Sequence, residues 1–136
     1  MPHNESFYPA DWLRIAEKDL SRVEKLLGLD DPEAAGFFLQ QAIEKFFKAF
    51  LLSRGWKLQR VHDLEVLLNA AISYDDSFGV FREVCQKVSG FYFVERYPFV
   101  IETGISVEVV RNSLQEVMGL IGLVRSTAKL GLKEQV

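Results

Sequence analysis

One helix governs the architecture of this chain: Gln40-Gln41-Ala42-Ile43-Glu44-Lys45-Phe46-Phe47-Lys48-Ala49-Phe50-Leu51-Leu52, closed by Arg54-Gly55. Its polar residues recur at spacings that place them on one stripe of a helix with about 3.6 residues per turn. This polar stripe consists of Gln40, Gln41, Glu44, Lys45 and Lys48. The rest of the cylinder is apolar, and a helix that is apolar around most of its girth is buried within a domain. We therefore expect the polar stripe to face water, a partner chain or a ligand.

Length and composition predict a single folded domain. The chain has 136 residues, of which 49% are hydrophobic, and it contains 11 Phe. A chain of this size buries roughly two-thirds of the surface that it exposes when unfolded, so it needs no disulfide or metal to hold a core. We expect one domain over residues 1–136, with its core at about 10–128.

Charge and cysteine content exclude several classes of protein. The net charge of −3 and the isoelectric point of about 5.4 argue against broad, nonspecific nucleic-acid binding. Cys85 is the only cysteine and is expected in the core, and no Cys/His cluster has the spacing of a zinc site. We find no P-loop, dinucleotide fingerprint or carboxylate cluster, and therefore expect no metal and no cofactor. The absence of a secretory signal and of an apolar run of about 20 residues predicts a cytoplasmic protein without membrane contact.

Hydrophobic periodicity predicts helices along most of the chain. We expect them at about Pro9–Leu27, Pro32–Arg54, His62–Ser73, Ser77–Phe91 and Ser106–Lys129. The inward residues of the first helix are Trp12, Ile15, Ala16, Leu20, Val23 and Leu27, and those of the last are Val109, Val110, Leu114, Val117, Ile121 and Val124. Gly28 and Gly55 are expected to end the first two helices, and Asp31 to cap the second. These elements indicate an all-α, antiparallel bundle.

The segment Phe91–Ile105 does not follow the helical period. Pro98 forbids a continuous helix there, and the segment is strongly aromatic. We expect an ordered loop that can include a short extended piece. Within it, Arg96 between aromatic residues could stack and still present its fork to a phosphate or carboxylate. The alternative is a packed loop in which Arg96 pairs with Glu95 or Glu102.

His62 is the only histidine outside the N-terminal tail. Histidine titrates near neutral pH without help, so His62 is the candidate general acid or base, or a hydrogen-bond donor to phosphate. The structural alternative places His62 at the start of the third helix, with Asp63 completing its first turn.

The segment 44–62 is basic, with five cations against Glu44 alone. They are Lys45, Lys48, Arg54, Lys57 and Arg60. One interpretation is a solvated helix end, where the helix dipole favours cations. The other is a small basic site for a phosphate or an acidic partner. Similarly, the polar stripe could be a set of exposed i,i+4 pairs, a subunit interface or the lining of a cleft.

Taken in order, these motifs resemble the HEPN family, the higher eukaryote and prokaryote nucleotide-binding domain. The resemblance covers roughly Trp12–Val124. It rests on Trp12 with Ala16-Glu17-Lys18-Asp19-Leu20, on Ala35–Leu51, on Arg54-Gly55 followed by His62-Asp63-Leu64, and on Arg96-Tyr97-Pro98. It implies an up-and-down bundle of four to five helices, like the substrate-binding subunit of nucleotidyltransferases, and commonly a homodimer. It also implies a nucleotide ligand and, in bacteria and archaea, a minimal nucleotidyltransferase partner in a toxin–antitoxin-like pair.

The resemblance breaks at the ribonuclease motif. HEPN members that cut RNA carry Arg, four to six residues, then His, frequently as Arg-Asn-x-x-x-His in a late helix. Here that helix reads Arg111-Asn112-Ser113-Leu114-Gln115-Glu116, so a carboxylate that repels phosphate stands where His is required. His62 has no Arg before it at this spacing. The motif is absent, and we expect that the chain is not an enzyme.

Three functions stay open, of which we favour the first. It is a non-catalytic, dimeric module that binds a nucleotide or docks a minimal nucleotidyltransferase. Its expected ligand-binding residues are Gln41, Glu44, Lys45, Lys48, His62 and Arg96. The second is an RNA-cleaving toxin with a degenerate site, in which Arg54 or Lys57 acts with His62. The third is a dimeric scaffold without a ligand.

Overall fold

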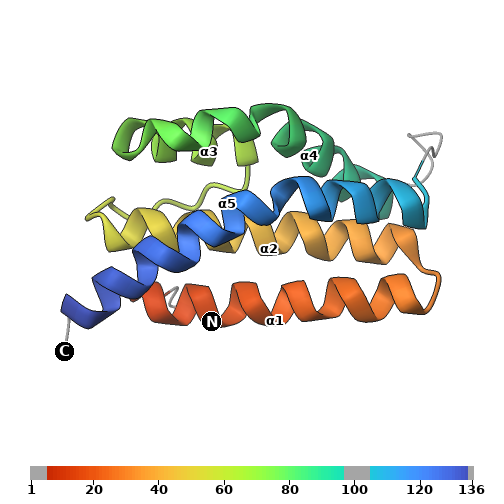
Figure 1. Ribbon diagram of the computed structural model, residues 1–136, viewed down its shortest axis with the longest axis horizontal. Coiled ribbons are helices and arrows are strands. Elements are labelled where there is room, and N and C mark those ends of the chain that lie inside the picture. The colour runs from red at the N-terminus through yellow and green to blue at the C-terminus, as the bar shows by residue number, and fades with distance from the viewer. Residues whose placement is uncertain (1–5, 97–104, 135–136) are drawn as a thin grey trace.

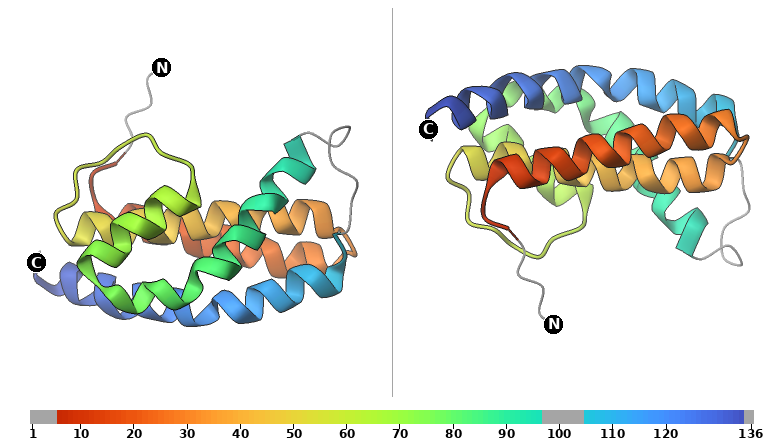
Figure 2. Two further views of the ribbon diagram at one scale, coloured as in Figure 1. Left: turned by 90° about the horizontal axis from the view of Figure 1, so that it is seen from above. Right: turned by 90° about the horizontal axis from the view of Figure 1, so that it is seen from below.

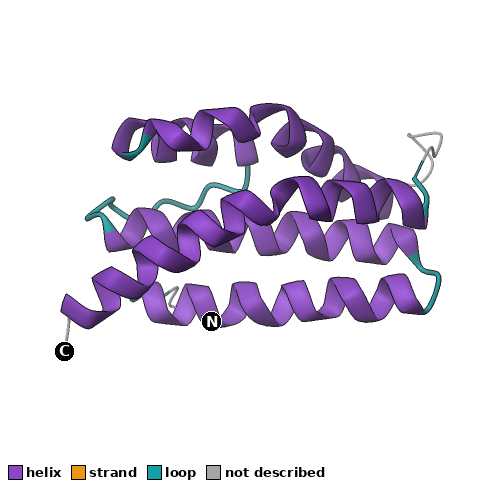
Figure 3. Ribbon diagram, in the orientation of Figure 1, coloured by secondary structure: helices purple, strands orange, loops and turns teal. Residues whose placement is uncertain are grey.

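The computed structural model describes residues 6–96 and 105–134, with side chains for 6–92 and 105–127. Over these residues it contains helices and no strand (Figure 3). The elements are α1 (Pro9–Gly28), α2 (Pro32–Ser53), α3 (Leu64–Tyr74), the 3₁₀ helix η1 (Asp76–Phe81), α4 (Arg82–Arg96) and α5 (Val107–Glu134). The predicted all-α bundle is confirmed. None of the helices in the described ranges is both long and apolar enough to cross a bilayer.

The helix α2 lies at the centre of the bundle, where it contacts α1, α3, α4 and α5. Figure 1 shows α1, α2 and α5 as long neighbouring rods, with α3 and α4 forming a second layer over them. α1 runs antiparallel to α2, and α4 runs antiparallel to α5. The connection 54–63 carries the chain back along α2 before α3 begins (Figure 2). The start of α3 therefore lies beside the middle of α2 and not at its end.

The centre of the core is aromatic. Phe46, Phe47 and Phe50 of α2 and Phe78 of η1 are fully buried. The ring centres of Phe50 and Phe78 lie 4.7 Å apart in a tilted arrangement, a favourable geometry for aromatic pairs. Since η1 joins α3 to α4, Phe78 anchors the second layer of the bundle to α2.

The end of α2 is fixed by a Schellman motif. Trp56 N donates to Leu51 O at 3.0 Å, and Gly55 N donates to Leu52 O at 3.2 Å. Gly55 has a φ of +88°, in the left-handed region that glycine adopts without steric cost. The predicted stop of the helix at Gly55 is confirmed.

The end of α1 differs from the prediction. Gly28 is the last helical residue and Leu29 is the C-cap. The left-handed position is taken by Asp30, whose φ is +59°. Asp31 then caps α2 by accepting a hydrogen bond from Ala34 N at 3.3 Å, as predicted.

The prediction of a loop from Phe91 onward is wrong over residues 91–96, because α4 continues to Arg96. Phe91 is buried and continues the helical spacing of Val84 and Val88, so packing carries the helix almost to Pro98. Residues 97–104, where a short extended piece was expected, lie outside the described residues. The predicted fourth helix also begins as η1, a 3₁₀ helix, before it becomes α4.

Two residues expected in the core lie at its edge. Ile15 and Val109 are 38% and 39% exposed. Each flanks the buried face of its helix, next to Ala16 and Val110 respectively, which are fully buried. The apolar faces are therefore narrower than the sequence pattern indicates.

The close packing of α2 against α4 depends on Gly36. A Cβ at this position would lie 2.9 Å from Phe91 Cβ and 3.0 Å from Ile105 Cδ1. Since a real Cβ does not approach another atom that closely, Gly36→Ala should lower the free energy of unfolding by about 1–3 kcal/mol. The matched control is Gly90→Ala in α4, where a Cβ meets nothing within 4 Å. It should raise the free energy of unfolding by up to about 1 kcal/mol. Urea denaturation measures both, and the same sign for both variants would contradict this packing.

Candidate functional site

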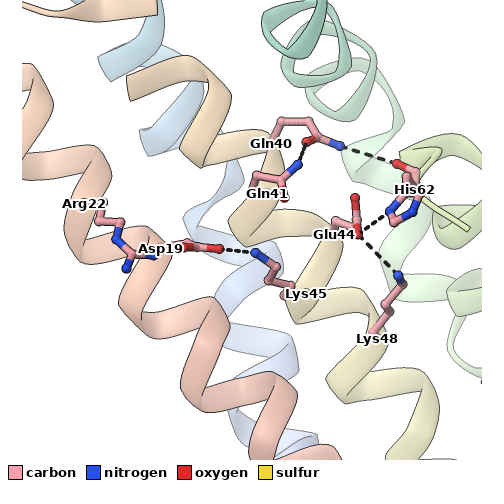
Figure 4. Close-up of polar contacts among 8 residues, drawn as sticks. All are labelled: Asp19, Arg22, Gln40, Gln41, Glu44, Lys45, Lys48 and His62. Carbon is pink, nitrogen blue, oxygen red and sulfur yellow. Dashed lines mark hydrogen bonds and ion pairs between the residues drawn. The ribbon is translucent and has the colours of Figure 1, made fainter. Parts of the chain in front are cut away.

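The polar stripe of α2 is divided between two clusters inside the domain (Figure 4). Gln40, Glu44 and Lys48 are only 4%, 3% and 0% exposed, and they face the connection 54–63. Gln41 and Lys45 lie on the side of α1. For the three buried side chains, the expectation of a stripe facing water or a partner chain is therefore wrong.

Glu44 joins the members of the first cluster. Its Oε2 accepts a hydrogen bond from Lys48 Nζ at 3.3 Å and lies 2.9 Å from His62 Nδ1. The Lys48 ammonium also lies 5.0 Å from the centre of the Trp12 ring on α1, a cation–π contact. A carboxylate and an aromatic ring thus compensate the charge of a fully buried lysine. The cluster connects α1, α2 and the segment before α3.

Asp19 of α1 is the centre of the second cluster. It is buried and accepts hydrogen bonds from Lys45 Nζ on α2 and from Arg22 on its own helix. The Arg22 guanidinium lies 5.4 Å from the centre of the Phe38 ring. This cluster ties α1 to α2 and uses the donors of Lys45 for that purpose.

One oxygen of Glu44 is left without a partner. Among the described residues, Glu44 Oε1 is a buried side-chain oxygen with no hydrogen bond. In Figure 4 it points toward the space between Gln40 and His62. An unpaired buried acceptor costs about 1–3 kcal/mol, and more when it is charged. The first cluster therefore contains an unused position for a hydrogen-bond donor.

A cavity of about 270 Å³ lies beside the first cluster. Its walls are predominantly apolar, and it is lined by Gln40, His62, Asp63, Leu64, Ser89 and Tyr92. It therefore lies between α2, the start of α3 and the second half of α4. Gln40 Nε2 donates to the carbonyl oxygen of His62 at 3.4 Å, across the wall that separates the cavity from Glu44. The Tyr92 ring is oriented by stacking on Phe37, with ring centres 5.8 Å apart.

A second cavity of about 170 Å³ adjoins the first, because Asp63 and Ser89 line both. Its other lining residues are Glu65, Leu68, Arg82, Cys85 and Gln86. Asp63 caps α3 by accepting from Glu65 N at 2.9 Å. The cap role that the sequence analysis left open for His62 and Asp63 therefore belongs to Asp63, and His62 precedes it.

Of the six described residues that line the larger cavity, the sequence predicted His62 as a site residue and missed the other five: Gln40, Asp63, Leu64, Ser89 and Tyr92. Gln40 belongs to the predicted polar stripe but is not among the expected site residues. Ser89 and Tyr92 are three residues apart and lie on one face of α4. That signal was lost because a loop was predicted from Phe91 onward.

Of the other predicted residues, Gln41, Glu44, Lys45 and Lys48 are not among those that line this cavity. Gln41 donates to Gln40 Oε1 at 2.7 Å, which supports the cavity wall from behind. Arg96 is the last residue of α4, and its side chain lies outside the described part of the structure. On α5, Arg111 is exposed and Glu116 lies 3.5 Å from Lys87 of α4.

Two of the five cations in the basic segment 44–62 pair with carboxylates inside the domain. Lys45 and Lys48 pair internally, which leaves Arg54, Lys57 and Arg60 as its exposed cations. The Arg54 guanidinium lies 5.6 Å from the centre of the Phe50 ring. In residues 6–96 and 105–134, no three His, Cys, Asp or Glu side chains are grouped as ligands for a metal ion.

Comparisons with known proteins agree on the fold. The family model described as the HEPN domain matches residues 9–127. The crystal structure of TT1696 from Thermus thermophilus is similar, with a TM-score of 0.70 and 23% identity over 88% of this chain and 97% of that chain. The structure of ST0689, an archaeal HEPN homologue, has a TM-score of 0.71 and 21% identity over 89% of this chain and 98% of that chain. At these identities the two structures establish the fold alone. No curated protein matches this chain.

The Glu44–Lys48 pair should be strongly coupled energetically. Lys48→Met leaves a carboxylate buried without its cation, and should lower the free energy of unfolding by about 3–5 kcal/mol. The double variant Glu44→Gln/Lys48→Met removes both charges and should regain most of this loss. Lys57→Met, at an exposed lysine of the neighbouring segment, should stay within about 0.5 kcal/mol of the wild type. Urea denaturation gives these values, and strictly additive effects of the two buried substitutions would contradict the pair.

Cys85 should behave as a core residue. Burial raises the pKa of its thiol to about 12. The positive charge of Arg82 lowers this pKa, but its effect is smaller than that of burial. At about pH 8 the thiol is therefore protonated, and the thiolate is the reactive form. We expect reaction with Ellman's reagent to be at least about a hundredfold slower in the native protein than in denaturant. Equal rates in the two states would show that the thiol is accessible.

Proposed function

This chain belongs to the HEPN family, and we propose that it is a non-catalytic module that binds a nucleotide, with the base in the cavity between Gln40, His62 and Tyr92. The observation that carries the proposal is this cavity, with a volume of about 270 Å³, mainly apolar walls and a few polar side chains. Binding sites for small molecules have this composition. A planar, largely apolar base with polar edges matches both features.

The charges around the cavity support a base inside it and phosphates outside. Among the side chains that the structure describes, the lining residues include Asp63 with its carboxylate and no Lys or Arg. A phosphate in the cavity would face this carboxylate in a confined space, whereas a ribose hydroxyl can donate to it. In the proposal, phosphates extend toward solvent, where Arg96 and the exposed cations Arg54, Lys57 and Arg60 are the candidate contacts.

One observation favours binding over RNA cleavage: Glu116, in the position where cleaving members have His, pairs with Lys87 on the neighbouring helix. His62 lies through its Nδ1 2.9 Å from a buried oxygen of Glu44 that also accepts from Lys48. In the proposal, Glu44 and Lys48 therefore orient His62, and Gln41 and Lys45 support the site from the side of α1.

The proposal keeps the two protein partners that the family resemblance implies, a second copy of the chain and a minimal nucleotidyltransferase. Exposed apolar side chains on α3, η1 and α5 support an interface. Val80 of η1 is 80% exposed, and Val66 of α3 and Met118 of α5 are also exposed. If these residues form a dimer interface, Val80→Asp should halve the molar mass that light scattering measures. A wild-type protein that is monomeric at micromolar concentration would remove the dimer from the proposal.

Isothermal titration calorimetry tests nucleotide binding. Wild-type protein is titrated with adenosine, AMP, ATP and the other nucleoside triphosphates. Because the base supplies the contacts, adenosine and AMP should bind within a few-fold of each other. Ser89→Trp fills the space shared by the two cavities and should weaken binding at least about tenfold. The matched control Ser21→Trp places the same side chain on the exposed face of α1 and should leave affinity unchanged. No heat with any of these ligands, or unchanged affinity in Ser89→Trp, would contradict the proposal.

A further inference from the structure

We propose that Glu44 Oε1 selects the base, by accepting a hydrogen bond from an exocyclic amino group such as that of adenine. This inference rests on the proposed function, since it concerns a ligand in the same cavity. In this inference, the unpaired buried oxygen of Glu44 determines which base the site accepts. Bases with a carbonyl group at the corresponding position are then rejected.

The orientation of the Glu44 carboxylate is fixed from its other side. Oε2 accepts from Lys48 Nζ at 3.3 Å and lies 2.9 Å from His62 Nδ1. Lysine can only donate, so rotation of the carboxylate brings the two oxygens into the same relation again. One oxygen is always paired with Lys48, and the other is left as an acceptor. Since both oxygens belong to a buried side chain, water from the bulk does not compete for this position.

The unpaired oxygen lies close behind one wall of the cavity. Gln40 and His62 both line the cavity, and Figure 4 shows Oε1 of Glu44 pointing between them. The wall is closed by the hydrogen bond from Gln40 Nε2 to the carbonyl oxygen of His62. At 3.4 Å this bond is longer than the usual range and is therefore weak. A donor on the ligand can displace it at small cost, while Gln40 Oε1 keeps its bond to Gln41 at 2.7 Å.

A carboxylate at this position distinguishes an amino group from a carbonyl oxygen. An amino group supplies the N–H donor that Oε1 lacks, and a hydrogen bond to a charged acceptor is stronger than a neutral one. A carbonyl oxygen would place two acceptors against each other in a buried site. Sites that hydrogen-bond a substrate group discriminate strongly against analogues without it. We expect at least a tenfold preference, corresponding to about 1.4 kcal/mol.

The first test uses wild-type protein and three nucleosides that differ at one position of the purine ring. Adenosine carries the amino group, purine riboside carries hydrogen, and inosine carries a carbonyl oxygen. Calorimetry should give affinities that fall in this order, with at least about a tenfold difference between adenosine and inosine. Equal affinities for the three nucleosides would overturn the inference, and would indicate that Oε1 is satisfied without the ligand.

The second test reverses the selectivity. In Glu44→Gln, Lys48 can donate only to the amide oxygen, so this oxygen takes the place of Oε2. The amide NH₂ group then occupies the position of Oε1 and presents a donor to the cavity. Inosine should now bind more tightly than adenosine. A general loss of structure weakens both ligands and cannot reverse their order. The control Glu24→Gln removes a carboxylate from the exposed side of α1 and should keep the preference for adenosine.

The outcomes separate this inference from the proposed function. Failure of every nucleoside and nucleotide to bind would contradict the proposed function itself. Binding without discrimination between adenosine and inosine would leave nucleotide binding in place and overturn the role of Glu44. If Glu44→Gln does not fold, as judged by circular dichroism, the wild-type nucleoside series alone decides the question.

Discussion

Glu44 and Lys48 form a buried ion pair on α2, the helix that every other α-helix of this bundle contacts. Because Glu44 and Lys48 are buried, water cannot stabilise their charges, and they must find partners within the chain. The desolvation cost of burying two charges is offset only when both charges are present in good geometry and their remaining hydrogen-bonding positions are filled. Lys48 meets this requirement through Glu44 and the Trp12 ring, whereas Glu44 meets it through one oxygen only. The requirement therefore fixes the positions of α1 and of the connection 54–63 relative to α2.

The same constraint forms the cavity. The connection 54–63 starts at the left-handed Gly55, ends at the α3 cap Asp63, and is held near its end by His62 beside Glu44. These contacts keep the start of α3 a fixed distance above α2, so that α4 covers the space between them with Ser89 and Tyr92. A site built from three helices and a tethered segment is pre-organised, since none of its described lining residues depends on a long unsupported loop.

Much of the fold could be predicted from the sequence because local signals agree with the tertiary structure. Asp31 was predicted as the N-cap of α2 and Gly55 as the residue that ends this helix. In the structure, Asp31 caps α2, and Gly55 follows it with a left-handed backbone conformation. Ile15 and Val109 could not be placed, because periodicity identifies a face but not how much of it neighbouring helices cover. The helical turn after Phe91 was missed for a related reason: its stabilisation comes from packing against α2, which is a long-range effect.

The candidate site was harder to predict than the fold, since its residues come from α2, α3, α4 and the connection before α3. The sequence identified Glu44, Lys48 and His62 correctly as neighbours in one motif, but their charges were interpreted as available to a ligand. Trp12, which contacts Lys48, and Asp19, which pairs with Lys45, lie on the preceding helix α1, and nothing local indicates either pairing. Only the polar stripe itself, on a helix otherwise suited to burial, signalled that charges would be enclosed.

His62 contributes in two ways to the position of the connection 54–63. Here Nδ1 of His62 is directed at a buried carboxylate that also holds Lys48, and the backbone carbonyl of His62 accepts from Gln40. The residue thus holds the connection 54–63 against α2 through both its ring and its main chain. A histidine with this structural task fits the proposed ligand-binding module, in which Glu44 is the group that contacts the ligand.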